Sequence, residues 1–462
     1  MKYVIFFLAL IIGVPAGIVF ARVNKTVEKI VFFLYIFLTT EAITINFVSR
    51  EFFTGTSRGF EVGIVDLIGI ILYSLIVLRA QKKPPRIIPP GAVIYFILFG
   101  FSLISITNSA PGYVMHSFFE IWKMVRMYLY FWINYNYIIK YSQYDYIVYC
   151  FRAIILYISY HVIRQKYFMG IWQARGPFPH QNSLVMYLII LNSVVLAYIM
   201  NKKQRIKLFW WVTTFALGSL CIVSTFSRAG IVCYVLSCMV IMMLSFTNSV
   251  NSRKVGVTIL IMFIGLLGAI RSMDSVIARF ESAPEASANV RKLLAVSAVN
   301  MANDKTFGVG LNNFGIKVKL PYNYSSHIEE LTEESRASLV ETIYLSYAAE
   351  TGWHNMVVYF VLLFYFYFKN LGNFVRYRRS DYTWLPIGLA GGLMGIYMES
   401  ALEWVLKQSN NFYQLMLCFA LIGSMDRLYQ DKQKLKWRVW KKKLRKIKEE
   451  EREKGKITIP HY

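Results

Sequence analysis

Long apolar runs recur along the whole chain, and they limit its possible folds more than any other feature. Examples are YVIFFLALIIGVPAGIVFA near the start and LFWWVTTFALGSLCIVSTF in the middle. A run of about 17–25 apolar residues is long enough to cross a bilayer as a helix. Hydrophobic residues make up 56% of the 462 residues and charged residues 17%, whereas soluble domains average about 45–50% and about 25%. The sequence therefore predicts an all-α, polytopic transmembrane helical bundle.

About 12–13 segments of the chain meet the length requirement for a membrane span. The first of them lacks a small-residue cleavage site, so we expect it to remain as a helix rather than to be removed as a signal peptide. The expected spans lie near residues 3–21, 29–48, 62–79, 91–107, 118–139, 146–168, 183–200, 208–224, 230–247, 255–272, 353–368, 384–402 and 411–427.

Basic loops occupy every second connection between these spans. They read RVNKTVEK, RAQKKPPR, NKKQRIK, NSRK and RYRRS, and the weakly basic connection at Lys140 falls in phase with them. Because lysine and arginine are retained on the cytoplasmic side, this alternation places the amino terminus outside and the carboxyl terminus inside. The net charge of +25 is then a topology signal rather than a sign of nucleic-acid binding, and the basic tail can also contact anionic lipid.

The same topology divides the chain into four parts. We expect N-terminal transmembrane helices over residues 1–169, a core over 170–370, C-terminal helices over 371–428 and a basic cytoplasmic tail over 429–462. The core includes one long outward-facing loop, 273–352, which comes before the last three helices.

Arginines gather on the outer side, where the positive-inside rule disfavours them. They are Arg175, Arg228, Arg279 and Arg291. Guanidinium groups bind phosphate bidentately and keep their charge, so this set indicates a site for a pyrophosphate at the outer headgroup level. The alternative for Arg228 is an interfacial arginine that extends to lipid headgroups. No metal-ligand spacing is visible and the five cysteines lie in apolar segments, so we expect neither a metal nor a cofactor.

The stretch SLVETIYLSYAAETGW, residues 338–353, contains a candidate general base. Glu341 and Tyr344 stand at helical spacing and would share one face of a helix. Glu341 could remove a proton from a sugar hydroxyl if burial raised its pKa; the alternative is a carboxylate paired with an arginine. In ARGPFPHQNSLVMYL, which begins at residue 174, His180 and Asn182 either cap the next helix or contact a sugar.

The order of these motifs resembles that of the O-antigen ligase and O-antigen polymerase-like superfamily. The resemblance spans roughly residues 170–370 and consists of G-x-F-x-H-x-N, then S-R-x-G, then an arginine followed by GVG-x-x-x-F, and last Y-L-x-x-x-x-E-x-G. The positions that carry it are Gly176, Phe178, His180, Asn182, Ser227, Arg228, Gly230, Arg291, Gly308, Val309, Gly310, Phe314, Tyr344, Leu345, Glu350 and Gly352.

The resemblance implies an inverting, metal-independent glycosyltransferase in the bacterial inner membrane, with its site facing outward. It implies an undecaprenyl-pyrophosphate-linked glycan as donor, a glycan or lipid-linked acceptor, and a role in cell-surface polysaccharide or lipopolysaccharide synthesis. Arg228 and Arg291 match the arginines that hold the pyrophosphate in the family. Ligases typically carry His-Asn-x-Tyr-Leu before a late helix, whereas Glu341 and Thr342 stand at the first two positions here, which leaves both ligation and polymerisation open.

Two other classes of function are compatible with the sequence. The first is a transporter or flippase of lipid-linked sugars, for which the intramembrane carboxylates Glu41, Asp66 and Glu399 would be the supporting residues, although no inverted repeat is visible. The second is a non-catalytic subunit of an envelope assembly. We expect Arg228, Arg291 and Glu341 to be catalytic, and Arg175, His180, Asn182, Arg279, Tyr344 and Glu350 to bind substrate.

Overall fold

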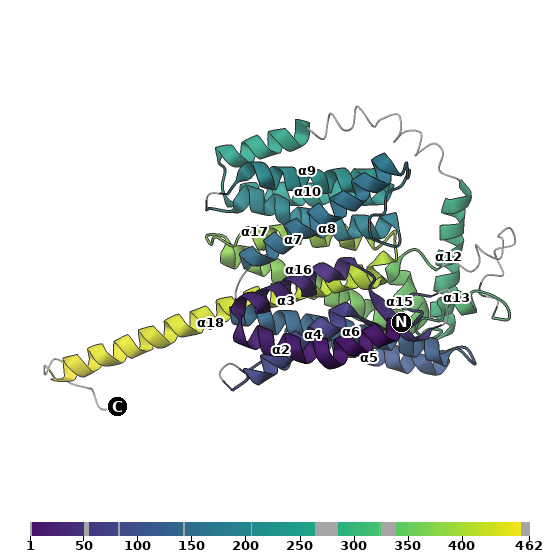
Figure 1. The fold of residues 1–462 in the computed structure, drawn as a ribbon, viewed down its shortest axis with the longest axis horizontal. Coiled ribbons are helices and arrows are strands. Elements are labelled where there is room, and N and C mark those ends of the chain that lie inside the picture. The colour runs from purple at the N-terminus through teal and green to yellow at the C-terminus, as the bar shows by residue number, and fades with distance from the viewer. Residues whose placement is uncertain are drawn as a thin grey trace.

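The computed structural model confirms the helical bundle (Figure 1). It describes residues 2–49, 55–81, 84–141, 144–204, 206–263, 285–322, 324 and 339–453. The first half of the chain forms α1 (Lys2–Leu8), α2 (Val14–Val23), α3 (Lys25–Phe37), α4 (Ile64–Leu78), α5 (Ala92–Ser105), α6 (Val114–Tyr141), α7 (Tyr144–Ile163), α8 (Gln181–Asn201), α9 (Leu208–Ser224) and α10 (Arg228–Asn248). A π-helical turn, η1 (Ala9–Gly13), joins α1 to α2, and another, η4 (Arg164–Phe168), extends α7.

The second half of the chain forms fewer and less regular elements. These are α12 (Glu285–Asp304), α13 (Phe314–Lys317), α15 (Ile343–Thr351), α16 (Trp353–Tyr377), α17 (Trp384–Glu399) and α18 (Ser409–Glu453). Short 3-10 turns occur at η2 (Leu38–Thr40), η3 (Ile106–Asn108) and η5 (Val405–Lys407). Residues 252–263 are also helical, so only part of the expected span 255–272 lies within the described residues.

One expected span is wrong in its second half. The segment 29–48 was expected to be a single helix, but α3 ends at Phe37 and residues Thr44–Ser49 form a strand, β1, that pairs antiparallel with β2 (Gly59–Gly63). The hydroxyls of Thr39 and Thr40 donate to the carbonyls of Ile36 and Phe37 at 2.8 and 2.9 Å. Such local side-chain hydrogen bonds compete with the helical pattern, and they close the helix before the hairpin begins.

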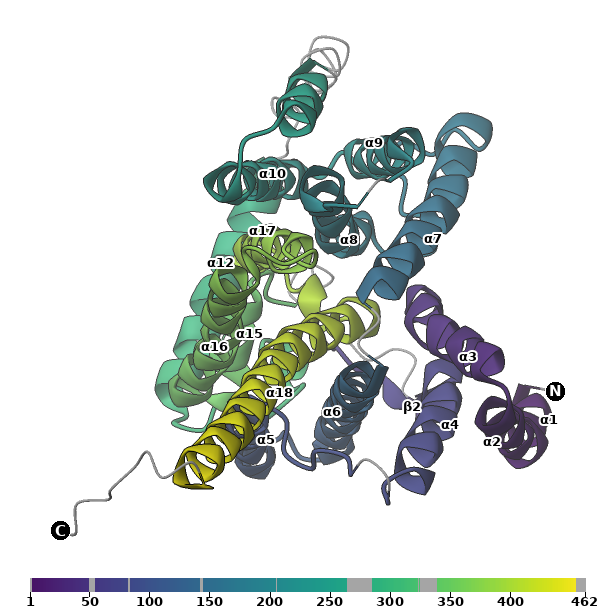
Figure 2. The same cartoon turned by 90° about the vertical axis from the view of Figure 1, so that its left-hand side faces the viewer.

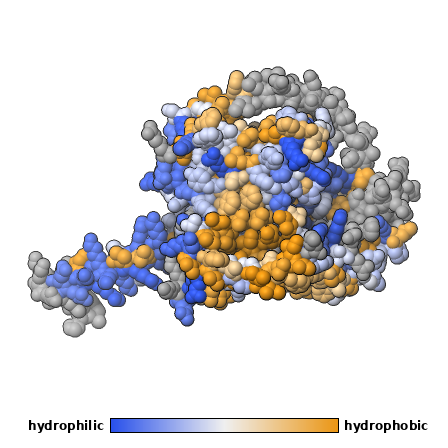
Figure 3. All heavy atoms as spheres, viewed as in Figure 1, coloured by the Kyte–Doolittle hydropathy of each residue, from blue (hydrophilic) through white to orange (hydrophobic). Residues whose placement is uncertain are grey.

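Five of the described helical segments are long and apolar enough to cross a membrane. They are Lys2–Val23, Tyr144–Phe168, Gln181–Asn201, Arg228–Asn248 and Trp353–Tyr377. On the face seen in Figure 3, apolar side chains cover much of the lower part of the helical body, whereas the protruding tail is mostly hydrophilic. An apolar surface of this kind suits contact with lipid.

Helix α8 forms the centre of the bundle and is buried from Asn182 to Asn201. It contacts α7, α9, α10 and α17, which surround it in Figure 2. Glycines on α17 allow it to pack closely on α8 and α10: a Cβ on Gly388 would lie 2.6 Å from the Cα of Val194 on α8, and one on Gly395 would lie 2.1 Å from Ser237 Oγ on α10. Small residues at membrane helix interfaces permit this close approach of backbones.

The two ends of the bundle differ. The C-terminal half of α18 extends beyond the bundle at one end, whereas α12, α13 and α15 lie at the other (Figure 1). The protruding part of α18 and the helices α12, α13 and α15 therefore lie at opposite ends of the bundle. We call the end that carries α12 and α15 the loop end.

Candidate functional site

A pocket of about 530 Å³ opens at the loop end. The first turns of α8 and α10, helix α12 and the residues after α17 form its walls. Its polar side chains include His180, Asn182, Arg228, Arg291 and Glu403. Because helix amino termini carry a partial positive charge, the ends of α8 and α10 add to the charge of the two arginines and favour a bound anion.

Arg228 is the first residue of α10, and its position is set by the motif around it. Phe226 has a φ of 52°, which turns the chain sharply, and the Ser227 hydroxyl then accepts a hydrogen bond from the Gly230 N–H at 3.4 Å. A Cβ on Gly230 would lie 2.2 Å from Val185 Cγ1 on α8. In S-R-x-G the serine therefore caps the helix, the glycine lets α10 approach α8, and the arginine lines the pocket.

Arg291, on α12, lies between two carboxylates. Its Nε is 3.8 Å from Glu341 Oε1, and its Nη2 is 3.5 Å from Glu403 Oε1. The Arg291 side chain is 45% exposed, whereas that of Glu403 is 5% exposed. The arginine is thus held loosely at the rim, where an incoming anion could compete for it, while the carboxyl group of Glu403 is sheltered from water.

The environment of Glu403 suits a proton acceptor near neutral pH. Burial raises its pKa to about 7, with a further contribution from the charge of Glu341, while Arg291 and a hydrogen bond from Asn182 oppose the rise. A group whose pKa lies near the working pH is the most effective general base. Glu341 itself is partly exposed, and it is not among the residues that line the pocket.

His180 caps α8, which is one of the two roles expected for it. Its Nδ1 accepts a hydrogen bond from the Asn182 N–H at 3.3 Å, and both residues also line the pocket. Partial burial, together with the nearby Arg291 and Arg175, lowers the pKa of His180. The imidazole is therefore kept neutral, so it serves as a cap and a hydrogen-bonding group rather than as a third cation.

The remaining expected site residues lie outside the pocket lining. The Arg175 guanidinium donates to the Pro179 carbonyl at 3.3 Å within its own loop, and the Tyr344 hydroxyl donates to the Tyr397 carbonyl at 2.7 Å. Glu341 and Tyr344 do not share a helix face, because α15 begins only at Ile343. Arg279 lies outside the described residues.

Glu350 supports the site structurally and does not line the pocket. It is 1% exposed and its carboxylate contacts Lys407 Nζ at 2.9 Å. The Glu350 backbone carbonyl accepts from the Gly310 N–H at 3.1 Å, next to a 2.8 Å bond from the Val309 N–H to the Ala349 carbonyl. The motifs GVG and E-x-G are thus joined to each other through their backbones.

Gly308 explains why the GVG motif needs glycine. It has a φ of 69°, and a Cβ there would lie 2.3 Å from the carbonyl carbon of Glu350. Only glycine adopts this conformation at so short a distance without strain. The motif therefore fixes α12 and α13 against α15 and, through α12, holds Arg291 at the pocket.

Glu403 was not among the site residues expected from the sequence. Glu399 stood out as an intramembrane carboxylate, and Glu403 lies one turn further along in ESALEWV. Two glutamates at i, i+4 at the end of an apolar run were the available signal. The contact of Glu403 with Arg291, 112 residues earlier, arises only from the tertiary packing.

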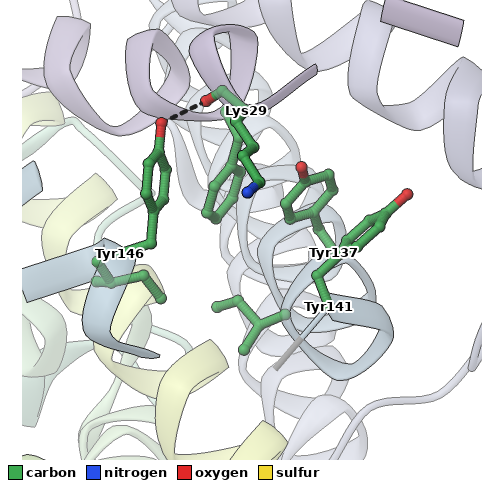
Figure 4. A pocket seen from close by; sticks show the side chains of 7 residues that line it. Lys29, Tyr137, Tyr141 and Tyr146 are labelled. Atoms are coloured by element: carbon green, nitrogen blue, oxygen red, sulfur yellow. Dashed lines mark hydrogen bonds between the residues drawn. The ribbon is translucent and has the colours of Figure 1, made fainter. Parts of the chain in front are cut away.

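A much smaller pocket, drawn in Figure 4, lies among α3, α6 and α7. Lys29, Tyr137, Tyr141 and Tyr146 line it, and the Tyr146 hydroxyl donates to the Lys29 carbonyl at 2.7 Å. Its volume of about 10 Å³ is at the lower limit for a single water molecule. This pocket is therefore a packing gap rather than a ligand site.

Comparison with known proteins supports the interpretation of the motifs. A model of the O-antigen ligase family matches residues 213–360, a range that includes Arg228, Arg291 and Glu341. His180 and Glu403 lie outside this range, although they line the same pocket. No curated protein matches the chain. The match over residues 213–360 confirms the resemblance to the O-antigen ligase family that the sequence motifs indicated.

Proposed function

We propose that the protein transfers a glycan from an undecaprenyl-pyrophosphate donor to a sugar hydroxyl at the outer face of the bacterial cytoplasmic membrane, in cell-surface polysaccharide synthesis. The observation that carries this proposal is the combination of Arg228, Arg291 and a carboxyl group with a pKa of about 7 around one pocket. The family match supports a membrane enzyme of glycan ligation or polymerisation.

The two arginines would hold the pyrophosphate. Each guanidinium can form a bidentate pair with a phosphate, and the amino terminus of α10, next to Arg228, adds peptide N–H groups directed at the same anion. As the bond between the sugar and the pyrophosphate breaks, negative charge grows on the departing oxygen. Cations already in place stabilise that charge without reorganisation.

Apolar residues on one side of the pocket would accept the prenyl chain. Val232, Met398 and Leu402 line the pocket and are 54%, 40% and 51% exposed. Exposed apolar side chains are expected where a helical bundle faces lipid. The pyrophosphate would lie at the arginines while the lipid part stays in the bilayer, as a membrane-bound donor requires.

Glu403 would act as the general base. The acceptor hydroxyl attacks the anomeric carbon, a new C–O bond forms, the bond to the pyrophosphate breaks, and Glu403 takes the hydroxyl proton. Arg291 lowers the pKa of Glu403 in the free protein. Once a pyrophosphate competes for Arg291, that effect weakens and Glu403 becomes a stronger base, so donor binding prepares the proton acceptor.

A deletion strain, complemented with the wild-type gene or with Arg228→Ala, tests the proposal. We expect the wild type alone to restore the surface polysaccharide, and the deletion strain to accumulate lipid-linked glycan on the outer leaflet. Single repeat units on the final acceptor indicate a polymerase, whereas complete chains left on the lipid carrier indicate a ligase. Accumulation on the inner leaflet would contradict the proposal and indicate a transporter.

A further inference from the structure

A second polar cavity lies beside the donor pocket. It has a volume of about 210 Å³ and is lined by η2 and the residues after it, the β-hairpin, the start of α4, α6 and the start of α18. We propose that this cavity binds an uncharged, hydroxyl-bearing sugar of the acceptor glycan, an inference that rests on the proposed function. Its volume is below the 300–1,000 Å³ or so of pockets for drug-sized ligands, which suits one sugar unit rather than a lipid or a long chain.

The hydrogen-bonding groups of the cavity are not all used within the protein. Arg126 reaches it from α6 and has a side chain that is 3% exposed. Its Nε and Nη2 are bonded to Asp66, with Nη2 also 2.8 Å from the Tyr413 hydroxyl. Its Nη1 has no hydrogen bond within the described residues and stands 3.5 Å from Glu61 Oε2. A buried donor without a hydrogen bond is costly, and a ligand hydroxyl would accept one from it.

The charge of the cavity selects against a second pyrophosphate. Glu41 and Glu61 line it, and Glu61 and Asp66 both pair with Arg126, so three carboxylates stand in or next to the cavity against one guanidinium. An anion would be repelled there, whereas hydroxyl groups can donate to the carboxylates and accept from Arg126. The donor pocket has the opposite balance, so the two cavities separate the charged part of the donor from a neutral acceptor.

The wall between the two cavities carries the proposed base. Pro179 lines the second cavity and His180 the first. The segment after α17 places Glu403 in the first cavity and Gln408 in the second, and the Ser183 hydroxyl donates to the Gln408 side chain. A sugar held in the second cavity would therefore lie next to the segment that carries Glu403, on the side of it that faces away from the donor pocket's arginines.

Saturation-transfer NMR on the full-length protein in lipid nanodiscs tests this site. The probes are a panel of methyl glycopyranosides at about 10 mM, since a single sugar unit is expected to bind only at millimolar concentration. Ala42→Trp fills the second cavity from an exposed position, and Ala229→Trp fills the donor pocket as the matched control. Glu61→Gln keeps the side-chain shape and removes one charged acceptor.

We expect saturation transfer to glycosides with wild-type protein and with Ala229→Trp, a loss of the signal with Ala42→Trp, and about tenfold weaker binding with Glu61→Gln. A signal that persists in Ala42→Trp, or no signal with the wild type, overturns the acceptor site. Binding of sugar-free undecaprenyl pyrophosphate is measured in parallel and should be lost only in Ala229→Trp. Failure of that lipid to bind wild-type protein would count against the proposed function, independently of the glycoside result.

Discussion

Replacing Glu403 with glutamine should remove activity and at the same time stabilise the protein at high pH. The substitution keeps the shape of the side chain but removes its charge and its ability to take a proton. We expect turnover to fall by about 10²–10⁴-fold, the usual contribution of a general base. A matched control is Glu449→Gln, which changes an exposed glutamate of the tail.

The size of the stability effect follows from the pKa of Glu403. A rise from its ordinary value of 4.5 to about 7 means that the ionised form costs the folded protein about 3 kcal/mol, at about 1.4 kcal/mol per pH unit. Because the folded protein holds this proton more tightly than the unfolded chain, the wild type loses stability as pH rises from about 4.5 to 7. Glutamine does not titrate, so Glu403→Gln escapes this loss.

The attraction of Arg291 is already part of this balance, because Arg291 lowers the pKa of Glu403. We therefore expect Glu403→Gln to be about 3 kcal/mol more stable than the wild type at pH 8, with the difference disappearing near pH 4.5. Unfolding in mixed detergent micelles at several pH values measures it. Equal pH dependence in the two proteins, or unchanged turnover in the variant, would refute the assignment of Glu403.

Three further substitutions test separate parts of the structure. Glu341→Gln should move the acidic limb of the pH–rate profile to lower pH, because the charge of Glu341 raises the pKa of Glu403; an unmoved limb would separate the two carboxylates. Gly230→Ala should destabilise the protein, since its Cβ would lie 2.2 Å from Val185. The control Gly100→Ala, whose Cβ would have nothing within 4 Å, should be neutral or stabilising by about 0.5–1 kcal/mol. Thermal unfolding compares the two variants, and equal effects would contradict the close contact at Gly230. Lys407→Met should lower the free energy of unfolding by about 3–5 kcal/mol, because it leaves Glu350 buried and unpaired. Adding Glu350→Leu should recover most of that stability. A double variant no more stable than the single one would show that the pair has another role.

The sequence predicted the helices well because long apolar runs are a local signal. Twelve of the expected spans coincide with helices, at least in part, and the thirteenth, 29–48, was half right. Its second half, TTEAITINFV, is less apolar than its first and begins with two threonines. The hydroxyls of Thr39 and Thr40 close α3 there, and a hairpin follows that the length of the run alone did not indicate. The division into four parts remains a prediction.

The site was only partly predictable, because its decisive contacts join distant segments. Four residues that the motifs singled out, His180, Asn182, Arg228 and Arg291, line one pocket, and their role there remains a prediction. Glu350 matched a motif just as well, yet its carboxylate is buried against Lys407. A motif shows which residues occur together. It does not distinguish a side chain that contacts a ligand from one that stabilises the surrounding structure.

The most direct test of the account is glycan transfer by the purified protein after Arg228→Lys and Arg291→Lys, measured with an undecaprenyl-pyrophosphate-linked glycan. Lysine keeps the positive charge but not the bidentate geometry. Arg427→Lys is the matched control, since that arginine pairs with Asp431 on α18. We predict a decrease of about a hundredfold or more in each of the two pocket variants and no change in the control, at equal protein levels. Full activity of both pocket variants would contradict the claim that these arginines hold the pyrophosphate.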